Sequence, residues 1–338
     1  MTTILAAIFV FGILVTIHEF GHFITAKLTG MKVEEFAIGF GPKIYQTKEG
    51  DTLYSLRMIP LGGYNKIAGM DPDDEKTPDG FSSKPMLSRM LVIVAGSLMN
   101  FILPVFLFFC IFAVNGIDQP TNSNVIGEVI KGKPAAVAGL KEGDRIIAIN
   151  GESVKSFDGL IQTLAKYPKT EVTFEVERNE IKKEIKITPE YNEDLKRPLI
   201  GVYPSYEKVS LSVFDSAKLS VVATKNVILN ISNGLIKIFT GNAPADVAGP
   251  IGVAQMAGEV AERGIMSLLN FVAFLSINLG IMNLLPIPAL DGGHLIVLSI
   301  EAIRGKPLSS KVMGAIQMVG FAIILAITAI ATFLDLTK

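Results

Sequence analysis

Residues 4–27 read ILAAIFVFGILVTIHEFGHFITAK, an apolar run long enough to cross a bilayer that carries two histidines and a glutamate near its end. About 20 mostly apolar residues span the hydrocarbon core as a helix. Ionisable side chains within such a helix are costly and mark functional sites. The run lacks the basic n-region and the small-residue cleavage site of a removable signal peptide. The run therefore predicts a retained membrane helix that carries a functional site.

The composition of the whole chain agrees with a membrane protein. Of the 338 residues, 49% are hydrophobic and 19% are charged, whereas a soluble domain carries about 25% charged residues. The formal net charge of −1 offers no basic surface for nucleic acid. A single cysteine, Cys110, excludes a disulfide framework and a cysteine-rich zinc finger.

Three further apolar runs bring the expected number of membrane spans to about four. They cover residues 90–114, 266–289 and 312–334. Lysine and arginine gather in the loop between the first two spans and in the loop between the last two, whereas the termini carry few. The positive-inside rule then places both termini, and the long segment between the second and third spans, outside the cytoplasm.

The long middle segment has charged, alternating sequence that is typical of strands. The patterns at 125–130 and 170–188 predict strands, the second as a hairpin that turns at Asn179, and 157–167 has helical periodicity. We expect four consecutive parts: 1–115 with the first two spans, 116–190 as an α+β domain, 191–265 as a helical segment at the membrane, and 266–338 with the last two spans.

One stretch of this α+β domain resembles a bacterial PDZ domain. A Gly139-Leu140 turn precedes the pattern G-D-x-I at residues 143–146. A PDZ domain binds an extended peptide at a sheet edge, and the resemblance gives that role to Gly139 and Leu140. The alternative is a small β-rich domain that only spaces the helices.

The ionisable residues of the first span form the pattern H-E-x-x-H, with His18, Glu19 and His22 at its fixed positions. Residues at i and i+4 lie on one helix face, so the two histidines can hold one metal ion. The glutamate between them can take a proton from water at that metal. The alternative, a hydrogen-bonded pair of histidines, does not account for burying the glutamate beside them.

A catalytic zinc site needs a third protein ligand. The metzincin pattern would supply a glycine and a histidine after His22, but Thr25 and Leu28 hold those positions. The remaining candidates are Asp291 and His294, in the run LDGGH at the end of the third apolar stretch. Spacing alone does not choose between these two.

The motifs together resemble the site-2 protease family, most closely the bacterial members that act in envelope-stress and sigma-factor signalling. They are HEFGH, the PDZ-like stretch, and N-x-x-P-x-P-x-L-D-G-G at residues 283–293, and Ala95-Gly96 with Asn100 also fits. The resemblance implies a membrane-embedded zinc (Zn²⁺) metalloendopeptidase with Asp291 as the third ligand. The chain departs from the family in having one PDZ-like unit, where some relatives have two, and Ser97 where proline is common.

The resemblance also implies which residues meet the substrate. The alternating stretch 36–42, with Gly39 and Gly41, resembles a membrane-re-entrant β-loop, and residues 53–58 are expected to pair with it. Without the resemblance, an ordinary loop is the simpler interpretation. Asn283, Pro286 and Pro288 would break the third span and meet an extended substrate, the alternative being a kinked helix without substrate contact.

The expected protein is thus a polytopic α-helical membrane protein with a membrane-associated β-loop and an inserted PDZ domain. The resemblance implies that it works in the inner membrane, near the cytoplasmic side. It would cleave single-span proteins, such as anti-sigma factors or remnant signal peptides, after an upstream site-1 protease has trimmed them outside. A metal transporter would need further acidic or histidine residues along its path, and a scaffold would not explain Glu19.

Overall fold

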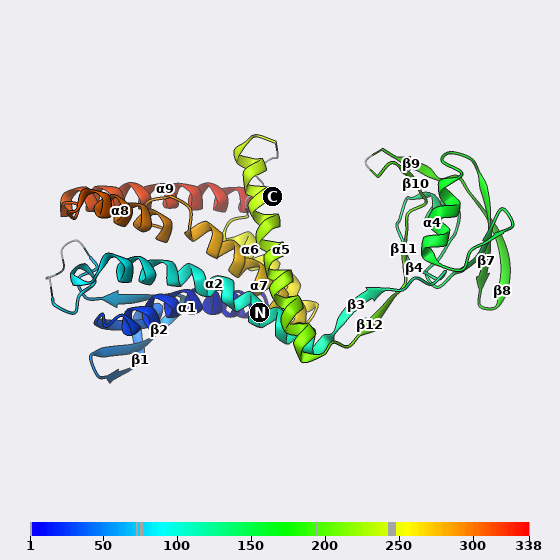
Figure 1. Cartoon of the computed structure of the whole chain (residues 1–338). Coiled ribbons are helices and arrows are strands. Elements are labelled where there is room, and N and C mark those ends of the chain that lie inside the picture. The colour runs from blue at the N-terminus through cyan, green and yellow to red at the C-terminus, as the bar shows by residue number, and fades with distance from the viewer. Residues whose placement is uncertain (1, 72–73, 75–76, 194, 243–247, 338) are drawn as a thin grey trace. The chain divides into compact units, whose positions relative to one another are not determined.

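The computed structural model describes residues 2–71, 74, 77–193, 195–242 and 248–337. The chain divides into two compact units (Figure 1). The first, called the helical unit here, comprises Met1–Val114 and Ser212–Lys338, and the second, the inserted unit, comprises Asn115–Leu211. The three parts expected at the membrane contribute to the helical unit. The expected boundary at residue 190 lies inside the inserted unit.

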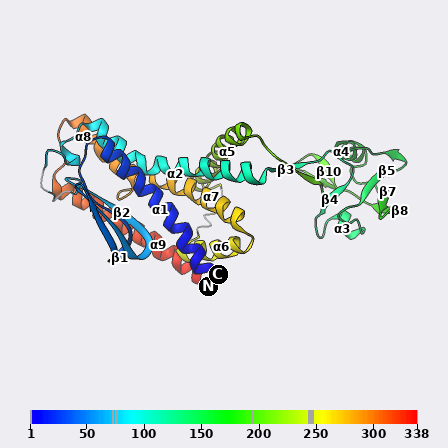
Figure 2. The same cartoon turned by 90° about the horizontal axis from the view of Figure 1, so that it is seen from below.

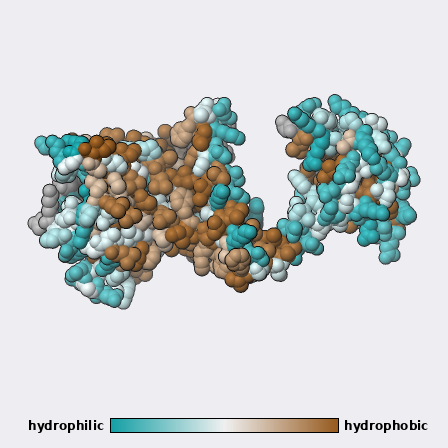
Figure 3. Space-filling view, in the orientation of Figure 1, coloured by the Kyte–Doolittle hydropathy of each residue, from teal (hydrophilic) through white to brown (hydrophobic). Residues whose placement is uncertain are grey.

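The helical unit contains seven α-helices among its described residues. They are α1 (Thr2–Leu28), α2 (Met86–Asn115), α5 (Val213–Phe239), α6 (Pro250–Glu262), α7 (Ile265–Asn283), α8 (Asp291–Arg304) and α9 (Ser310–Thr337), with a short 3₁₀ turn η1 (Phe81–Ser83) before α2. By length and composition, α1, α2, α5, α7 and α9 are able to cross a membrane. Hydrophobic side chains cover much of the visible face of this unit (Figure 3). The expected polytopic helical fold is confirmed.

Helix α5 is an addition to the four expected spans, and it differs from them. Figures 1 and 2 show that it runs crosswise to α1, α2 and α9. Its apolar sequence is interrupted by Lys218, Lys225 and Lys237. This geometry fits the interpretation of the segment as a helix lying at the membrane surface.

The third expected span is shorter than predicted. Helix α7 ends at Asn283, and the chain turns through residues 284–290 before α8 begins at Asp291. Pro286 and Pro288 lack the N–H that would continue the helical ladder. The third span is therefore broken where the sequence motif begins, and Asp291 opens a new helix rather than closing the old one.

Helices α1 and α2 approach each other closely through small residues. A Cβ atom on Gly21 of α1 would lie 2.3 Å from the Ala95 carbonyl oxygen of α2. A Cβ on Gly96 of α2 would lie 2.2 Å from the ring of His22. Small residues permit such close contact between helix backbones in membranes. The two glycines thereby bring α2 directly against the polar face of α1.

Between α1 and α2, two long bent strands, β1 (Val33–Glu49) and β2 (Thr52–Ile67), form an antiparallel sheet. The expected pairing is present, since Phe36 lies opposite Tyr54. Residues 36–38 also pair with 63–65 on their other side. They therefore lie inside the sheet, and the substrate contacts expected for this stretch stay a prediction. The segment 63–67 lies beside 36–38 as the next strand of the sheet.

The bend of β1 at Gly39 and Gly41 has a structural cause. Gly39 has a φ of +89°, and a Cβ there would lie 2.6 Å from the Ile59 carbonyl oxygen. Arg57 of β2 donates through Nη1 to the Gly41 carbonyl oxygen at 2.8 Å and through Nη2 to Oε1 of Glu35 at 2.8 Å. These contacts between β2 and β1 stabilise the bend of the sheet.

The inserted unit is built mainly from short strands. They are β3 (Ile117–Pro120), β4 (Ile126–Val129), β5 (Arg145–Ile149), β6 (Glu152–Ser153), β7 (Val172–Arg178), β8 (Ile181–Ile187), β9 (Glu190–Asn192), β10 (Arg197–Leu199), β11 (Val202–Pro204) and β12 (Tyr206–Val209), with helices α3 (Pro134–Val137) and α4 (Phe157–Ala165). The order β6-β5-β7-β8 defines its main sheet, and β4 pairs with β11. The predicted hairpin turn is confirmed, with Asn179 at a φ of +52°.

Strands β9 to β12 correct the prediction of a helical segment from residue 191 onward. Strand β12 pairs with β3, so the first and last strands of the inserted unit lie side by side. The short strands of 190–209 lack a clear alternation, which is why the sequence did not reveal them. Helix begins only at Val213.

The Gly139-Leu140 turn serves the packing of the inserted unit. The Leu140 side chain is 4% exposed and lies in the hydrophobic core with Ile146 and Phe174. The N–H groups of both turn residues donate to carbonyls of the preceding helix. Peptide binding by this pair stays a prediction.

The aspartate of the G-D-x-I pattern stabilises the same turn through hydrogen bonds. Asp144 is fully buried and accepts two hydrogen bonds from Arg178, at 2.6 and 2.7 Å, and one from the Lys141 N–H at 2.8 Å. Burial acts to raise the pKa of Asp144, but these hydrogen bonds outweigh it and hold the pKa below its usual range. Arg178 also donates to the Gly139 carbonyl oxygen.

This ion pair makes the inserted unit sensitive to acid. A carboxyl whose pKa is lowered by folding stabilises the fold above its unfolded value of about 3.9, and this contribution is lost as the pH falls through the folded value. We expect Asp144→Asn to destabilise the unit by about 2–3 kcal/mol at pH 7, because Arg178 loses its charged partner. Hydrogen exchange of peptides from 126–200 in the whole chain measures this loss.

The exposed pair of Lys166 and Glu152 is the matched control, with side chains 57% and 45% exposed. Exposed ion pairs contribute little to stability, so Glu152→Gln should leave the exchange of these peptides unchanged. Equal protection in wild type and Asp144→Asn at pH 7 would show that the buried pair does not stabilise the unit.

Candidate metal centre

The two histidines of α1 direct their Nε2 atoms toward each other. Helical spacing places His18 and His22 on one face of α1, and their Nε2 atoms lie 3.2 Å apart. Each side chain is only 12% exposed. Two neutral imidazole nitrogens at this distance either share a proton or share a cation. The pair is the arrangement that the H-E-x-x-H pattern predicts.

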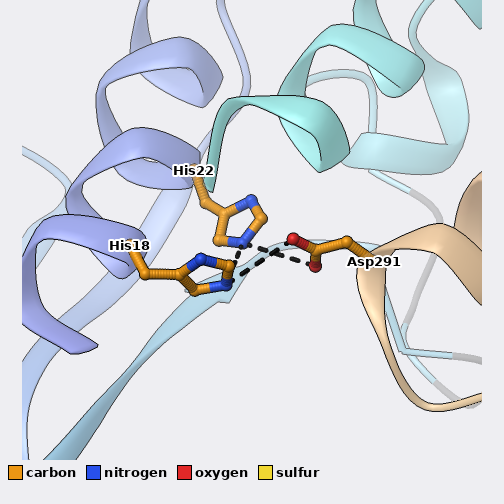
Figure 4. A group of neighbouring side chains, drawn as sticks. All are labelled: His18, His22 and Asp291. Carbon is orange, nitrogen blue, oxygen red and sulfur yellow. Dashed lines mark hydrogen bonds and ion pairs between the residues drawn. The ribbon is translucent and has the colours of Figure 1, made fainter. Parts of the chain in front are cut away.

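Asp291 reaches the histidines from the start of α8 (Figure 4). Its Oδ2 lies 3.6 Å from Nε2 of His18, and its Oδ1 lies 3.6 Å from Nε2 of His22. His18, His22 and Asp291 are the one group of potential metal ligands found among the described residues. His294, the alternative third ligand, lines the same cavity but is not part of this group.

The donor set and its spacing fit zinc. Zinc takes imidazole nitrogen and carboxylate oxygen at about 2.0–2.2 Å in tetrahedral geometry, which separates neighbouring ligand atoms by about 3.3–3.6 Å. The two nitrogens lie 3.2 Å apart, and each lies 3.6 Å from a different oxygen of Asp291. One ligand atom from each residue lies within 4.8 Å of the others, so the three side chains are close enough to hold one ion. Three protein ligands leave the fourth position open, as catalytic zinc sites require.

Both histidine rings are oriented by groups on α2. Nδ1 of His22 lies 2.8 Å from the Val92 carbonyl oxygen, which fixes the proton on Nδ1 and leaves Nε2 free for a metal. The amide of Asn100 lies 3.2 Å from Nδ1 of His18, and its buried Oδ1 has no partner. If the amide nitrogen and oxygen of Asn100 are exchanged, Oδ1 accepts the Nδ1 proton of His18. The buried oxygen then has a partner, and Nε2 of His18 is left free for a metal.

Glu19 lies beside the metal group and is held by the sheet. Asn65 of β2 donates through Nδ2 to Oε2 of Glu19 at 3.0 Å and also to the Glu19 backbone oxygen. One oxygen of the Glu19 carboxylate is thus tied to β2. Asn65 carries no signal in the sequence, because nothing in its local pattern links β2 to α1.

Ser97 makes a contact that the sequence did not reveal. Its hydroxyl donates to Oδ2 of Asp291 at 3.0 Å. The substitution for proline was visible in the sequence, but its partner lies 194 positions away and appears only in the fold.

The metal group opens into a cavity of about 290 Å³. Its lining comes from α1, β2, the α7–α8 turn and α8: His18, Glu19, His22, Tyr64, Asn65, Ile67, Met70, Asn283, Ala289, Leu290, Asp291 and His294. Asn283 lies at the metal group, with Nδ2 3.4 Å from Nδ1 of His18. Among the described residues, the other predicted substrate contacts, Gly39, Gly41, Pro286 and Pro288, do not line this cavity.

A model of peptidase family M50 matches residues 6–327 of the chain. The zinc metalloprotease RasP of Geobacillus kaustophilus is 32% identical over 417 aligned positions, which cover 100% of this chain and 98% of the relative. The regulator of sigma-W protease RasP of Bacillus subtilis is 32% identical, with 100% and 99% covered. A putative zinc metalloprotease of Clostridium acetobutylicum is 36% identical, with 98% and 96% covered.

Among solved structures, the PDZ domain of an SdrC-like protein from Listeria innocua is 21% identical. The match covers 28% of this chain and 100% of that domain, with a TM-score of 0.23.

The full-length match and the three converging ligands agree with each other and confirm the resemblance drawn from the motifs. The chain therefore belongs to peptidase family M50, as a zinc metalloprotease of the polytopic, site-2 protease type.

Proposed function

We propose that this protease cleaves the transmembrane segments of single-span membrane proteins after a first cut outside the cytoplasm. The observation that carries the proposal is the convergence of His18, His22 and Asp291 beside Glu19 within the helical unit. The Bacillus subtilis relative is named as a regulator of sigma-W protease, which supports anti-sigma factors as a substrate class. Remnant signal peptides are the other class that fits a short, single-span substrate.

In this mechanism, Glu19 takes a proton from the attacking water and delivers it to the leaving amine. Asn65 holds one carboxylate oxygen of Glu19, and Glu19 lines the cavity. His18, His22 and Asp291 would hold a zinc ion, which when bound would supply Lewis-acid chemistry for the scissile carbonyl and for water. Val92 and Asn100 keep the imidazoles in the orientation that this requires.

The substrate has to be extended before it is cut, because a helical peptide carbonyl is already hydrogen-bonded. An edge strand holds an extended chain by backbone hydrogen bonds. Tyr64, Asn65 and Ile67 of β2 line the cavity, which supports this edge as the docking strand. Gly39 and Gly41 then act by shaping the sheet, and Asn283 offers its amide to the substrate backbone.

We further propose that both termini and the inserted PDZ-like unit lie outside the cytoplasm. Figures 1 and 2 show the N- and C-terminal ends at one end of the helical unit and α8 with the start of α9 at the other. Arg304, Lys306 and Lys311 lie at the α8 end, which the positive-inside rule assigns to the cytoplasm. The PDZ-like unit would exclude bulky ectodomains or read the end left by the upstream protease.

A metal transporter receives less support. A transit path needs successive metal-binding positions across the membrane, and the described residues contain a single group able to hold a metal.

Removing the base should abolish turnover without emptying the metal site. We expect Glu19→Gln to bind zinc as wild type does and to lower cleavage by at least about 100-fold, because the amide does not accept the proton. The measurement is cleavage of a purified single-span substrate in detergent, with zinc content per chain determined in parallel.

The matched control is Glu34→Gln, since Glu34 is a half-exposed carboxylate on β1 that pairs with Lys66. Cleavage by this variant should equal that of wild type. Wild-type turnover by Glu19→Gln would refute the role of Glu19.

The third ligand is tested by comparing Asp291→Ala with His294→Ala. Loss of one of three ligands should weaken zinc binding by more than about 100-fold in Asp291→Ala. Loss of a residue that only contacts a ligand weakens zinc binding by at most about 10–100-fold. We expect His294→Ala to bind zinc within a few-fold of wild type, as measured by competition with a chelator. The opposite ranking would transfer the ligand role to His294.

A further inference from the structure

Ser97 makes a contact that the proposed mechanism does not yet use. It lies on α2, is fully buried, and donates its hydroxyl to Oδ2 of Asp291 at 3.0 Å. The contact joins α2 to the first residue of α8 inside the helical unit. It therefore links the helix that orients the histidines to the segment that carries the third ligand.

The direction of this hydroxyl is unusual for a serine within a helix. Such hydroxyls commonly return to a carbonyl of their own helix. Ser299 donates to the Leu295 carbonyl oxygen in this way, and Thr224 to that of Ser220. Ser97 instead donates across to a carboxylate on another helix, and a hydrogen bond to a charged acceptor is roughly twice as strong as one between neutral groups.

Apart from the two histidines, few groups contact the Asp291 carboxylate. Asp291 follows the 284–290 turn, in which Ala289 has a φ of +71°, and the cap residue Leu290 offers no side-chain hydrogen bond. Within the described part of the chain, Ser97 is the one hydrogen-bond donor to the Asp291 side chain. Ser97 is therefore the contact outside the metal group that sets the orientation of the carboxylate.

Ser97 also completes a pattern on α2. The Val92 carbonyl meets His22, the Asn100 amide meets His18, and the Ser97 hydroxyl meets Asp291. Each of the three metal ligands thus has its outer hydrogen-bonding partner on the same helix. Such outer partners fix the ligand atoms in the geometry that the metal requires.

We infer that Ser97 is a positioning residue that holds the Asp291 carboxylate for metal binding, an assignment that rests on the zinc-binding role proposed for Asp291.

Zinc affinity of the full-length protein in detergent tests the inference. Loss of an outer partner weakens metal binding by about 10–100-fold, and we expect this increase in the zinc Kd for Ser97→Ala. The Co²⁺-loaded variant should also show a changed visible absorption spectrum, since the spectrum reports the ligand geometry. Ser220→Ala is the matched control, because Ser220 is equally buried but donates to its own helix; its Kd should equal that of wild type.

A double-mutant cycle separates positioning from general packing. If Ser97 acts through Asp291, then Ser97→Ala should have no further effect on zinc affinity in an Asp291→Ala background. An equal loss in both backgrounds, or a wild-type Kd for Ser97→Ala alone, overturns the inference while leaving the proposed function intact. Failure of the wild-type protein to bind zinc overturns the proposed function, and this inference with it.

Discussion

Two imidazoles and a carboxylate lie within 4.8 Å of one another among apolar helices, and this cluster constrains the elements around it. Buried polar groups destabilise a fold unless each has a hydrogen-bonding or metal partner. Helix α2 supplies these partners, and it reaches them only because Gly96 has no side chain to displace the rings of His18 and His22. The spacing of α1 against α2 is therefore set by the chemistry of the centre as much as by hydrophobic packing.

The remaining parts of the centre come from irregular structure. A continuous third span would carry Asp291 past the histidines, whereas the turn between α7 and α8 returns it to them. The close approach of this turn is visible at Gly292, where a Cβ would lie 2.2 Å from the Leu285 carbonyl oxygen. The sheet then closes the other side through Asn65 and Glu19. Helices place the ligands, and the turn and the sheet complete the site.

The sequence revealed those features that are local. His18, Glu19 and His22 are a short helical pattern, and four spans follow from continuous apolar runs. Asp291 was one of two candidates on spacing alone, and the family resemblance selected it. The roles of Asn65 and Ser97 could not be predicted, because each contacts a partner that is distant in sequence and carries no periodic signal. The position of residues 36–38 inside the sheet was not predictable for a similar reason: alternation marks a strand but does not say which neighbours it has.

The pairing of β3 with β12 brings the two ends of the inserted unit together in one two-stranded ladder. An insert whose entry and exit are adjacent can be lengthened, duplicated or replaced without moving the helices that carry it. The relative from Geobacillus kaustophilus aligns over 417 positions against the 338 residues of this chain, so its length includes segments that this chain lacks. A ladder of this kind makes the inserted unit a module that can change in size while the helices of the metal centre stay in place.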